Sequence, residues 1–261
     1  MTDLMLVNPL FLQDDPVERE LMTPYFPLGL LYLAATARDA GFQVSIFDAM
    51  FETNDDAFVA ALEREQPRIV GLGVLATVRA AALRLAGLAH ERGAMVIAGG
   101  ADPTGRPESY LRHQANGSRP VDVVAIGEAE DTLLQMLPVL LEDGPGSPRL
   151  QEVAGLAYLD GLDRMVTTEA RPHCPDLDSL ALPARDLLDL EDYRRAWRGK
   201  HGLFSLSIIA TRGCPYGCKW CQKSVFGRSF RPRSPESVAD EMKLIKDQYR
   251  PDQLRIVDDV M

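Results

Sequence analysis

Residues 68–98 decide the fold, and they read RIVGLGVLATVRAAALRLAGLAHERGAMVIA. The runs Arg68–Val74 and Met95–Ala98 are short and dominated by residues that are typical of strands buried on both faces of a sheet. Between them, Thr77–Arg92 has the length of a helix and stops at Gly93, and glycine is favoured just past a helix end. The order strand, helix, strand predicts a β-α-β unit with parallel strands.

The same alternation extends outward over most of the first 141 residues. It predicts three more strands, at Leu4–Val7, Gln43–Phe47 and Val121–Ile126, and four more helices, at Pro27–Ala40, Asp55–Arg64, Pro107–Gln114 and Glu128–Leu141. Five strands joined by helices make an α/β fold with a doubly wound parallel sheet. In such a sheet a ligand is expected beyond the carboxyl ends of the strands.

Turn-forming residues divide the chain into three parts. The stretch 142–149 is rich in glycine, proline and acidic residues and indicates a boundary, so we predict a first domain over 1–145. A connector over 146–201 contains a predicted hairpin, with strands Val153–Leu159 and Met165–Thr168, and a short helix near Ala184–Leu190. A second α/β unit over 202–261 has strand Leu203–Ala210, helix Pro235–Tyr249 and strand Leu254–Val257.

Composition excludes several classes of protein. The chain has 261 residues, of which 46% are hydrophobic and 25% charged, so it is an ordinary globular sequence. Its net charge of -10 argues against a nucleic-acid partner, because general attraction to phosphates needs a basic surface. The start lacks the features of a signal peptide, and no apolar run reaches the roughly 18 residues of a membrane span. We therefore expect a cytoplasmic protein with no membrane span.

The second unit contains a cysteine loop, Thr211-Arg-Gly-Cys-Pro-Tyr-Gly-Cys-Lys-Trp-Cys221. Three thiolates that are so close in sequence suit metal binding better than disulfides. A zinc site would need a fourth ligand, for which Cys174 and His201 are the candidates. An iron–sulfur cluster on Cys214, Cys218 and Cys221 would leave one iron open for a further ligand. The nearby cations Arg212, Lys219 and Lys223 favour the cluster.

This loop resembles the signature of the radical S-adenosylmethionine (SAM) enzymes, in which the cysteines follow the first strand of a partial TIM barrel. The resemblance implies a [4Fe-4S] cluster on the three cysteines, SAM bound at the open iron, and Trp220 against the adenine. It further implies that Asp258 or Asp259, after the second barrel strand, receives the ammonium of SAM. The alternative for this acidic pair is a solvated strand end.

The loops after the third, fourth and fifth strands of the first domain supply small and polar residues to one edge of the sheet. Together with 27–34, they resemble the cobalamin-binding domain, of flavodoxin or Rossmann type, that precedes the radical domain in a large subclass of the family. The resemblance implies that cobalamin contacts Thr77, Val78, Gly99, Gly100, Gly127 and Glu128. Because Asn8-Pro9 stands where histidine-ligating relatives have their motif, no histidine is expected on cobalt. A dinucleotide fingerprint at 71–76 lies in the wrong strand for a nicotinamide cofactor.

The resemblance implies a cobalamin-dependent radical SAM methyltransferase that acts on an unactivated centre of a small molecule. An electron donor such as flavodoxin or ferredoxin would be its partner. A ring-forming enzyme of the same subclass and a non-catalytic cobalamin-binding module are the alternatives. The sequence identifies no catalytic side chain. A full radical-family barrel needs more strand–helix repeats than these residues hold, so we expect further chain after Met261 and leave open the activity of these 261 residues alone.

Overall fold

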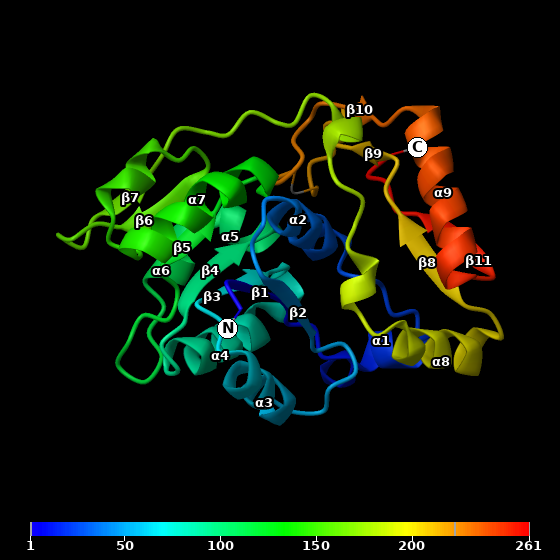
Figure 1. Cartoon of the computed structure of the whole chain (residues 1–261), viewed down its shortest axis with the longest axis horizontal. Helices are drawn as coiled ribbons and strands as arrows, with labels where there is room; N and C mark the ends of the chain where they lie inside the picture. Colours follow the sequence, from blue (N-terminus) through cyan, green and yellow to red (C-terminus); the bar gives the residue numbers. More distant parts are fainter. Residues whose placement is uncertain (1, 222, 261) are drawn as a thin grey trace.

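Strands between residues 4 and 167 form one seven-stranded sheet in the computed structural model, which describes residues 2–221 and 223–260 (Figure 1). Five neighbouring strands run parallel in the order β2-β1-β3-β4-β5. This order reverses direction at β1, as in flavodoxin-like sheets, and so creates a crevice at the carboxyl ends. The parallel strands are β1 (Leu4–Asn8), β2 (Val44–Asp48), β3 (Ile69–Gly73), β4 (Met95–Gly99) and β5 (Val123–Ala125).

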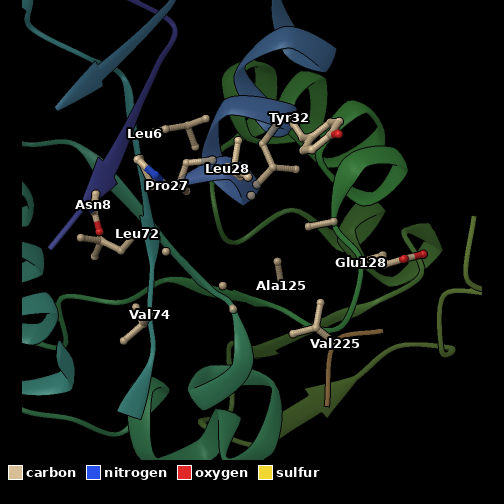
Figure 2. A pocket seen from close by; sticks show the side chains of 18 of the residues that line it. Leu6, Asn8, Pro27, Leu28, Tyr32, Leu72, Val74, Ala125, Glu128 and Val225 are labelled. Carbon is tan, nitrogen blue, oxygen red and sulfur yellow. The ribbon is translucent and has the colours of Figure 1, made fainter. Parts of the chain in front are cut away.

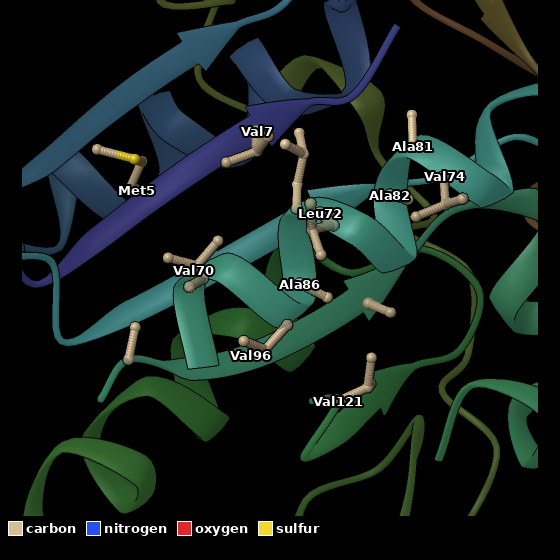
Figure 3. Close-up of a cluster of buried hydrophobic side chains, with 14 of the residues drawn as sticks. Met5, Val7, Val70, Leu72, Val74, Ala81, Ala82, Ala86, Val96 and Val121 are labelled. Atoms are coloured by element: carbon tan, nitrogen blue, oxygen red, sulfur yellow. The ribbon is translucent and has the colours of Figure 1, made fainter. Parts of the chain in front are cut away.

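Helices cover both faces of this sheet, as predicted from the alternating pattern. They are α2 (Leu28–Asp39), α3 (Asp56–Glu65), α4 (Arg79–His90), α5 (Ala101–Gly105), α6 (Pro107–Leu111) and α7 (Glu130–Asp143), after a short α1 (Pro16–Leu21). Alternate residues of β1 enter different cores. Met5 and Val7 belong to the core that includes α3 and α4 side chains (Figure 3). Leu4 and Leu6 belong to the core that includes α2 and α7 side chains. Burial on both faces explains why these strands read as continuous apolar runs.

The predicted hairpin extends the sheet. Strands β6 (Leu156–Leu159) and β7 (Met165–Thr167) are antiparallel, and β6 pairs antiparallel with β5. The hairpin is therefore part of the same sheet as the five parallel strands, although the sequence placed it only in the connector. Its tip is held by Asp163, which accepts hydrogen bonds from Arg112 and Arg119.

The carboxyl-terminal unit lies on the opposite side of the molecule from the hairpin (Figure 1). Strands β8 (Ser205–Ile208) and β11 (Gln253–Ile256) are parallel neighbours, and α9 (Pro235–Tyr249) connects them as predicted. A core of α2, α8, α9 and β8 side chains joins this unit to the first, and includes Leu31, Trp197, Leu206 and Ile245. Among the described residues, no helix is long and apolar enough to cross a membrane.

One long helix was not predicted. The expected helix near Ala184–Leu190 is a 3-10 turn over Arg185–Leu187, and it is followed by α8 (Leu190–His201). The carboxylate of Asp189 caps α8 by accepting the Glu191 amide, and Tyr193 and Trp197 are its buried side chains. The domain boundaries after 145 and 201 stay predictions.

A buried ion triad ties the connector to the carboxyl-terminal unit. Arg185 Nη2 lies 2.8 Å from Glu241 Oε1, and Arg233 pairs with the other oxygen of the same carboxylate. Arg185 also donates a hydrogen bond to the Ser207 carbonyl at 2.9 Å. Because a buried charge without its partner is costly, this triad fixes how the connector crosses β8 and α9.

Candidate functional site

A cavity of about 350 Å³ opens at the carboxyl ends of the parallel strands (Figure 2). One wall comes from the ends of β1, β3, β4 and β5, and a second from the first turns of α2. The opposite side belongs to the carboxyl-terminal unit. The lining is mostly apolar and includes Leu6, Asn8, Tyr32, Leu72, Val74, Ala125, Ile209, Arg212, Val225 and Phe226. The crevice expected from the sheet topology is therefore present, and the segment that contains the cysteines helps to close it.

Most of the residues predicted to contact cobalamin line this cavity. They are Val78, Gly99, Gly100, Gly127 and Glu128. Thr77 does not line it: this side chain is exposed and lines a separate surface depression beside Arg79 and His113. Asn8, Tyr32 and the four cavity residues of the carboxyl-terminal unit were not predicted as site residues. Arg212 was predicted only as a cation that favours the cluster, and nothing in the sequence indicates that it lines the cavity at the ends of the strands.

Gly100 allows the loop after β4 to turn close to the loop after β3. Its φ is +103° with ψ -172°, a conformation open essentially to glycine alone. A Cβ here would lie 2.7 Å from the Val74 carbonyl oxygen and 3.0 Å from the Val74 nitrogen. After this turn, Asp102 is buried and accepts two hydrogen bonds from Arg79, at 2.6 and 2.5 Å. The hydrogen bonds from Arg79 outweigh burial and hold the pKa of Asp102 below its ordinary value.

We predict that Gly100→Ala destabilises the fold and weakens ligand binding in the cavity. The loss in the free energy of unfolding should be about 1–3 kcal/mol, because alanine must adopt a conformation that glycine adopts freely. Gly146→Ala is the matched control, since a Cβ there would meet no atom within 4 Å. Denaturant unfolding of both variants measures the effect, and equal stabilities would contradict the assignment.

Glu128 is buried between two arginines rather than pointing free into the cavity. Its carboxylate accepts hydrogen bonds from Arg231, at 2.7 and 3.0 Å, and from the Cys174 amide at 2.7 Å. Arg212 lies 3.5 Å from the same carboxylate and 2.7 Å from Glu130. Burial acts to raise the pKa of Glu128, but these hydrogen bonds and charges outweigh it and hold the pKa below its ordinary value. The carboxylate is therefore ionised and joins the two halves of the chain.

The cysteine loop begins and ends on a short antiparallel ribbon, β9 (Thr211–Arg212) and β10 (Arg231–Pro232). Cys214 is half-buried, and Cys218 and Cys221 are exposed; all are free thiols. Lys223 donates to the Cys214 carbonyl at 3.1 Å. Within 2–221 and 223–260, no three metal-ligating side chains are gathered closely enough to form a metal site. The loop thus presents three thiols from one segment without drawing them together.

The residues predicted to contact SAM have different environments. Asp258 accepts hydrogen bonds from the Ala210 and Thr211 amides at 2.7 and 3.1 Å, and Asp259 accepts one from Gly213 at 3.2 Å. These carboxylates fix the chain where it leaves β8 for the cysteine loop. The Trp220 side chain is 88% exposed and does not line the cavity. Neither candidate for a fourth zinc ligand lines the cavity.

Comparisons with known proteins identify the first domain and its relatives. A family model described as "B12 binding domain" matches residues 18–137. An uncharacterized methyltransferase of Pyrococcus horikoshii is 26% identical over 94% of this chain and 51% of its own length. Hopanoid C-3 methylase of Methylococcus capsulatus is 33% identical over 90% of this chain and 42% of its own length. The anaerobic magnesium-protoporphyrin IX monomethyl ester cyclase of Cereibacter sphaeroides is 28% identical over 88% of this chain and 37% of its own length.

The fold of the chain is shared with a solved structure. OxsB, described as a cobalamin-dependent S-adenosylmethionine radical enzyme with aqua-cobalamin and S-adenosylmethionine bound, superposes with a TM-score of 0.78 at 20% identity. The superposition covers 99% of this chain and 34% of that one. The chain spans about half the length, or less, of the curated relatives reported above. The chain contains a B12-binding domain, and over most of its length it is similar to proteins described as cobalamin-dependent radical S-adenosylmethionine enzymes.

Proposed function

We propose that the chain binds cobalamin in the cavity and a [4Fe-4S] cluster on Cys214, Cys218 and Cys221. We further propose that the protein to which it belongs is a SAM-dependent methyltransferase. One observation carries the proposal: a single cavity is lined both by strand ends of the B12-binding domain and by Arg212, Val225 and Phe226 around the cysteine loop. The cavity ligand and a cluster on the cysteines would thus be held by neighbouring segments of the chain.

The lining residues fit a broad, flat ring. Gly99 and Gly127 add no side chain at the strand ends, and a Cβ on Gly29 would meet no atom within 4 Å, so the α2 wall is open at its first turn. The apolar side chains of Leu72, Val74 and others would exclude water from the ring face. None of the described residues that line the cavity is a histidine.

The donor set of the cysteine loop fits a cluster. Three free thiols lie in one loop whose two ends are fixed by a ribbon, and Lys223 is bound near Cys214. The basic residues of this segment would balance the negative charge of a thiolate-bound cluster. When bound, the two cofactors would supply the reductive cleavage of SAM and the transfer of a methyl group, with the electron coming from a donor such as flavodoxin or ferredoxin. Trp220, Asp258 and Asp259 stay proposals for SAM contacts.

A ring-forming reaction is the second candidate, because relatives named as cyclases match over most of the chain. Methyl transfer is favoured by the methyltransferases and the methylase among the matches, one of which is 33% identical over 90% of this chain. Small-molecule substrates suit both reactions. A binding module without catalysis would take up cobalamin alone.

Anaerobic reconstitution followed by iron and sulfide analysis tests the proposal. We expect about four iron and four sulfide ions per chain, the content of one cubane cluster. A parallel absorbance titration with hydroxocobalamin should saturate at one cobalamin per chain. Formation of 5'-deoxyadenosine from SAM then tests whether these residues suffice for cleavage. A stoichiometric zinc centre in place of the cluster would overturn the proposal, and cobalamin uptake with no cluster would leave only the binding module.

A further inference from the structure

The ribbon that closes the cysteine loop has two arginines directly opposite one another. Arg212 of β9 pairs with Arg231 of β10 in the antiparallel register, and their side chains are only 4% and 11% exposed. Like charges at directly opposed positions destabilise a strand pair. Burial makes the repulsion worse, since water no longer screens it. The ribbon therefore depends on counter-charges from elsewhere in the chain.

Those counter-charges come from the wall of the cavity. Glu128 lies between the two arginines: both of its carboxylate oxygens accept hydrogen bonds from Arg231, and Arg212 Nη1 lies 3.5 Å from Oε1. Arg212 Nη2 also lies 2.7 Å from Glu130 Oε1, so Glu130 balances its charge. Two carboxylates and two guanidinium groups make a neutral buried cluster. Glu128 lies in the segment between β5 and α7, Glu130 is the first residue of α7, and both line the cavity.

The same cluster fixes the connector over the base of the loop. Glu128 accepts the Cys174 amide, and Arg231 donates to the Cys174 carbonyl at 2.7 Å. Beside it, the His173 ring leaves no room for a Cβ on Gly227, which would lie 2.5 Å from Cε1. Arg212 itself lies 5.1 Å from the centres of both the Tyr32 and Phe226 rings, across the cavity wall. Ribbon, connector and cavity wall thus meet at one carboxylate.

We propose that Glu128 is a positioning residue that keeps the cysteine loop closed against the cavity, and that loop closure is thereby coupled to binding in the cavity. Without this carboxylate, two buried positive charges would face each other with only Glu130 to balance them. The ribbon would then open at Arg231, which loses its carboxylate partner. The proposal concerns this chain's own contacts, and it rests on the proposed function only for the identity of the cavity ligand.

Amide hydrogen exchange of the chain without cofactors tests the positioning role. In Glu128→Gln, we expect the amides of residues 211–221 to exchange about tenfold faster or more, as loss of a hydrogen-bonded buried charge pair implies, while those of β3 keep the rate of the parent chain. Glu108→Gln is the matched control, because Glu108 is an exposed partner of Arg112 at 2.8 Å. Equal rates in both variants, or a uniform acceleration that includes β3, would overturn the positioning role.

A second variant tests the charge argument separately. Glu128→Gln combined with Arg231→Gln removes one charge of each sign, so the ribbon no longer has opposed cations. We expect its loop amides to exchange more slowly than those of Glu128→Gln alone. Exchange as fast as, or faster than, that of the single variant would contradict the charge argument.

Hydroxocobalamin serves as the probe for coupling. In the parent chain it should slow exchange of the loop amides. In Glu128→Gln, at hydroxocobalamin concentrations raised until the absorbance change saturates, it should not slow them. Equal protection of the loop in both chains would overturn the coupling. Failure of the parent chain to bind cobalamin would overturn the proposed function instead, and the exchange rates without cofactor would still decide the role of Glu128.

Discussion

The Cys218→Ala variant is expected to assemble no iron–sulfur cluster while its affinity for cobalamin stays that of the parent chain. A cubane held by three thiolates has no spare protein ligand, so removal of one leaves two irons without a protein donor. Cys218 is exposed on the loop and does not line the cavity, so its loss should not disturb a ligand there. Iron and sulfide analysis after anaerobic reconstitution and an absorbance titration with hydroxocobalamin measure the two effects.

Cys174→Ala provides the matched control for this experiment. Cys174 is also a free thiol, but it lies in the connector, and its contacts with Glu128 and Arg231 are made by backbone atoms. The alanine variant should therefore keep the cluster and the fold. A full cluster in Cys218→Ala, or its loss in Cys174→Ala, would contradict the ligand assignment.

The Glu241→Gln variant is expected to lose about 3–5 kcal/mol of the free energy of unfolding, because it leaves two buried cations without their anion. Glu241 is fully buried and pairs with both Arg185 and Arg233. A glutamine keeps one acceptor oxygen but balances neither charge. Urea or guanidinium unfolding, followed by circular dichroism, gives the loss from the shift in midpoint.

Asp186→Asn is the control for the buried triad. Asp186 neighbours Arg185 in the chain but pairs with Arg38 at the surface, where both side chains are largely exposed. Screening by water limits such a pair to about 1 kcal/mol or less. If both variants lost the same small amount, the triad would not be the contact that fixes the connector.

Local chemistry was enough to predict the first domain. All five parallel strands and their main helices were predicted from apolar runs such as Met95–Ala98 and from helix-ending residues such as Gly93. The predicted ends differ from the observed ones by a few residues. The crevice followed from topology, and five of the six predicted cobalamin contacts line it. The exception, Thr77, belongs to a 3-10 turn over Ala76–Val78 that directs it to the surface, whereas we expected it to begin the helix.

Long-range contacts were beyond this kind of reasoning. Neither the periodicity nor the spacing of residues indicates that β6 pairs with β5. The same is true of the ion pair between Glu128 and Arg231, which are 103 residues apart. Helix α8 was missed because half of its residues are charged and Gly199 is a poor helix former. Its signal was the i, i+4 pair Tyr193 and Trp197 behind the capping Asp189, which tertiary packing turns into a buried face.

The hairpin determines where a fragment of the first domain can end, because β6 pairs with β5. A recombinant fragment that ended at 145 would lack β6, so β5 (Val123–Ala125) would become an unpaired, apolar edge strand. Such a strand can pair with a strand of another molecule. When the hairpin is kept, the edge strand is β7, which is only three residues long, and the turn before it is fixed by the ion pairs of Asp163 with Arg112 and Arg119. Any fragment of this chain that is to keep the edge of its large sheet paired should therefore run at least through Thr168.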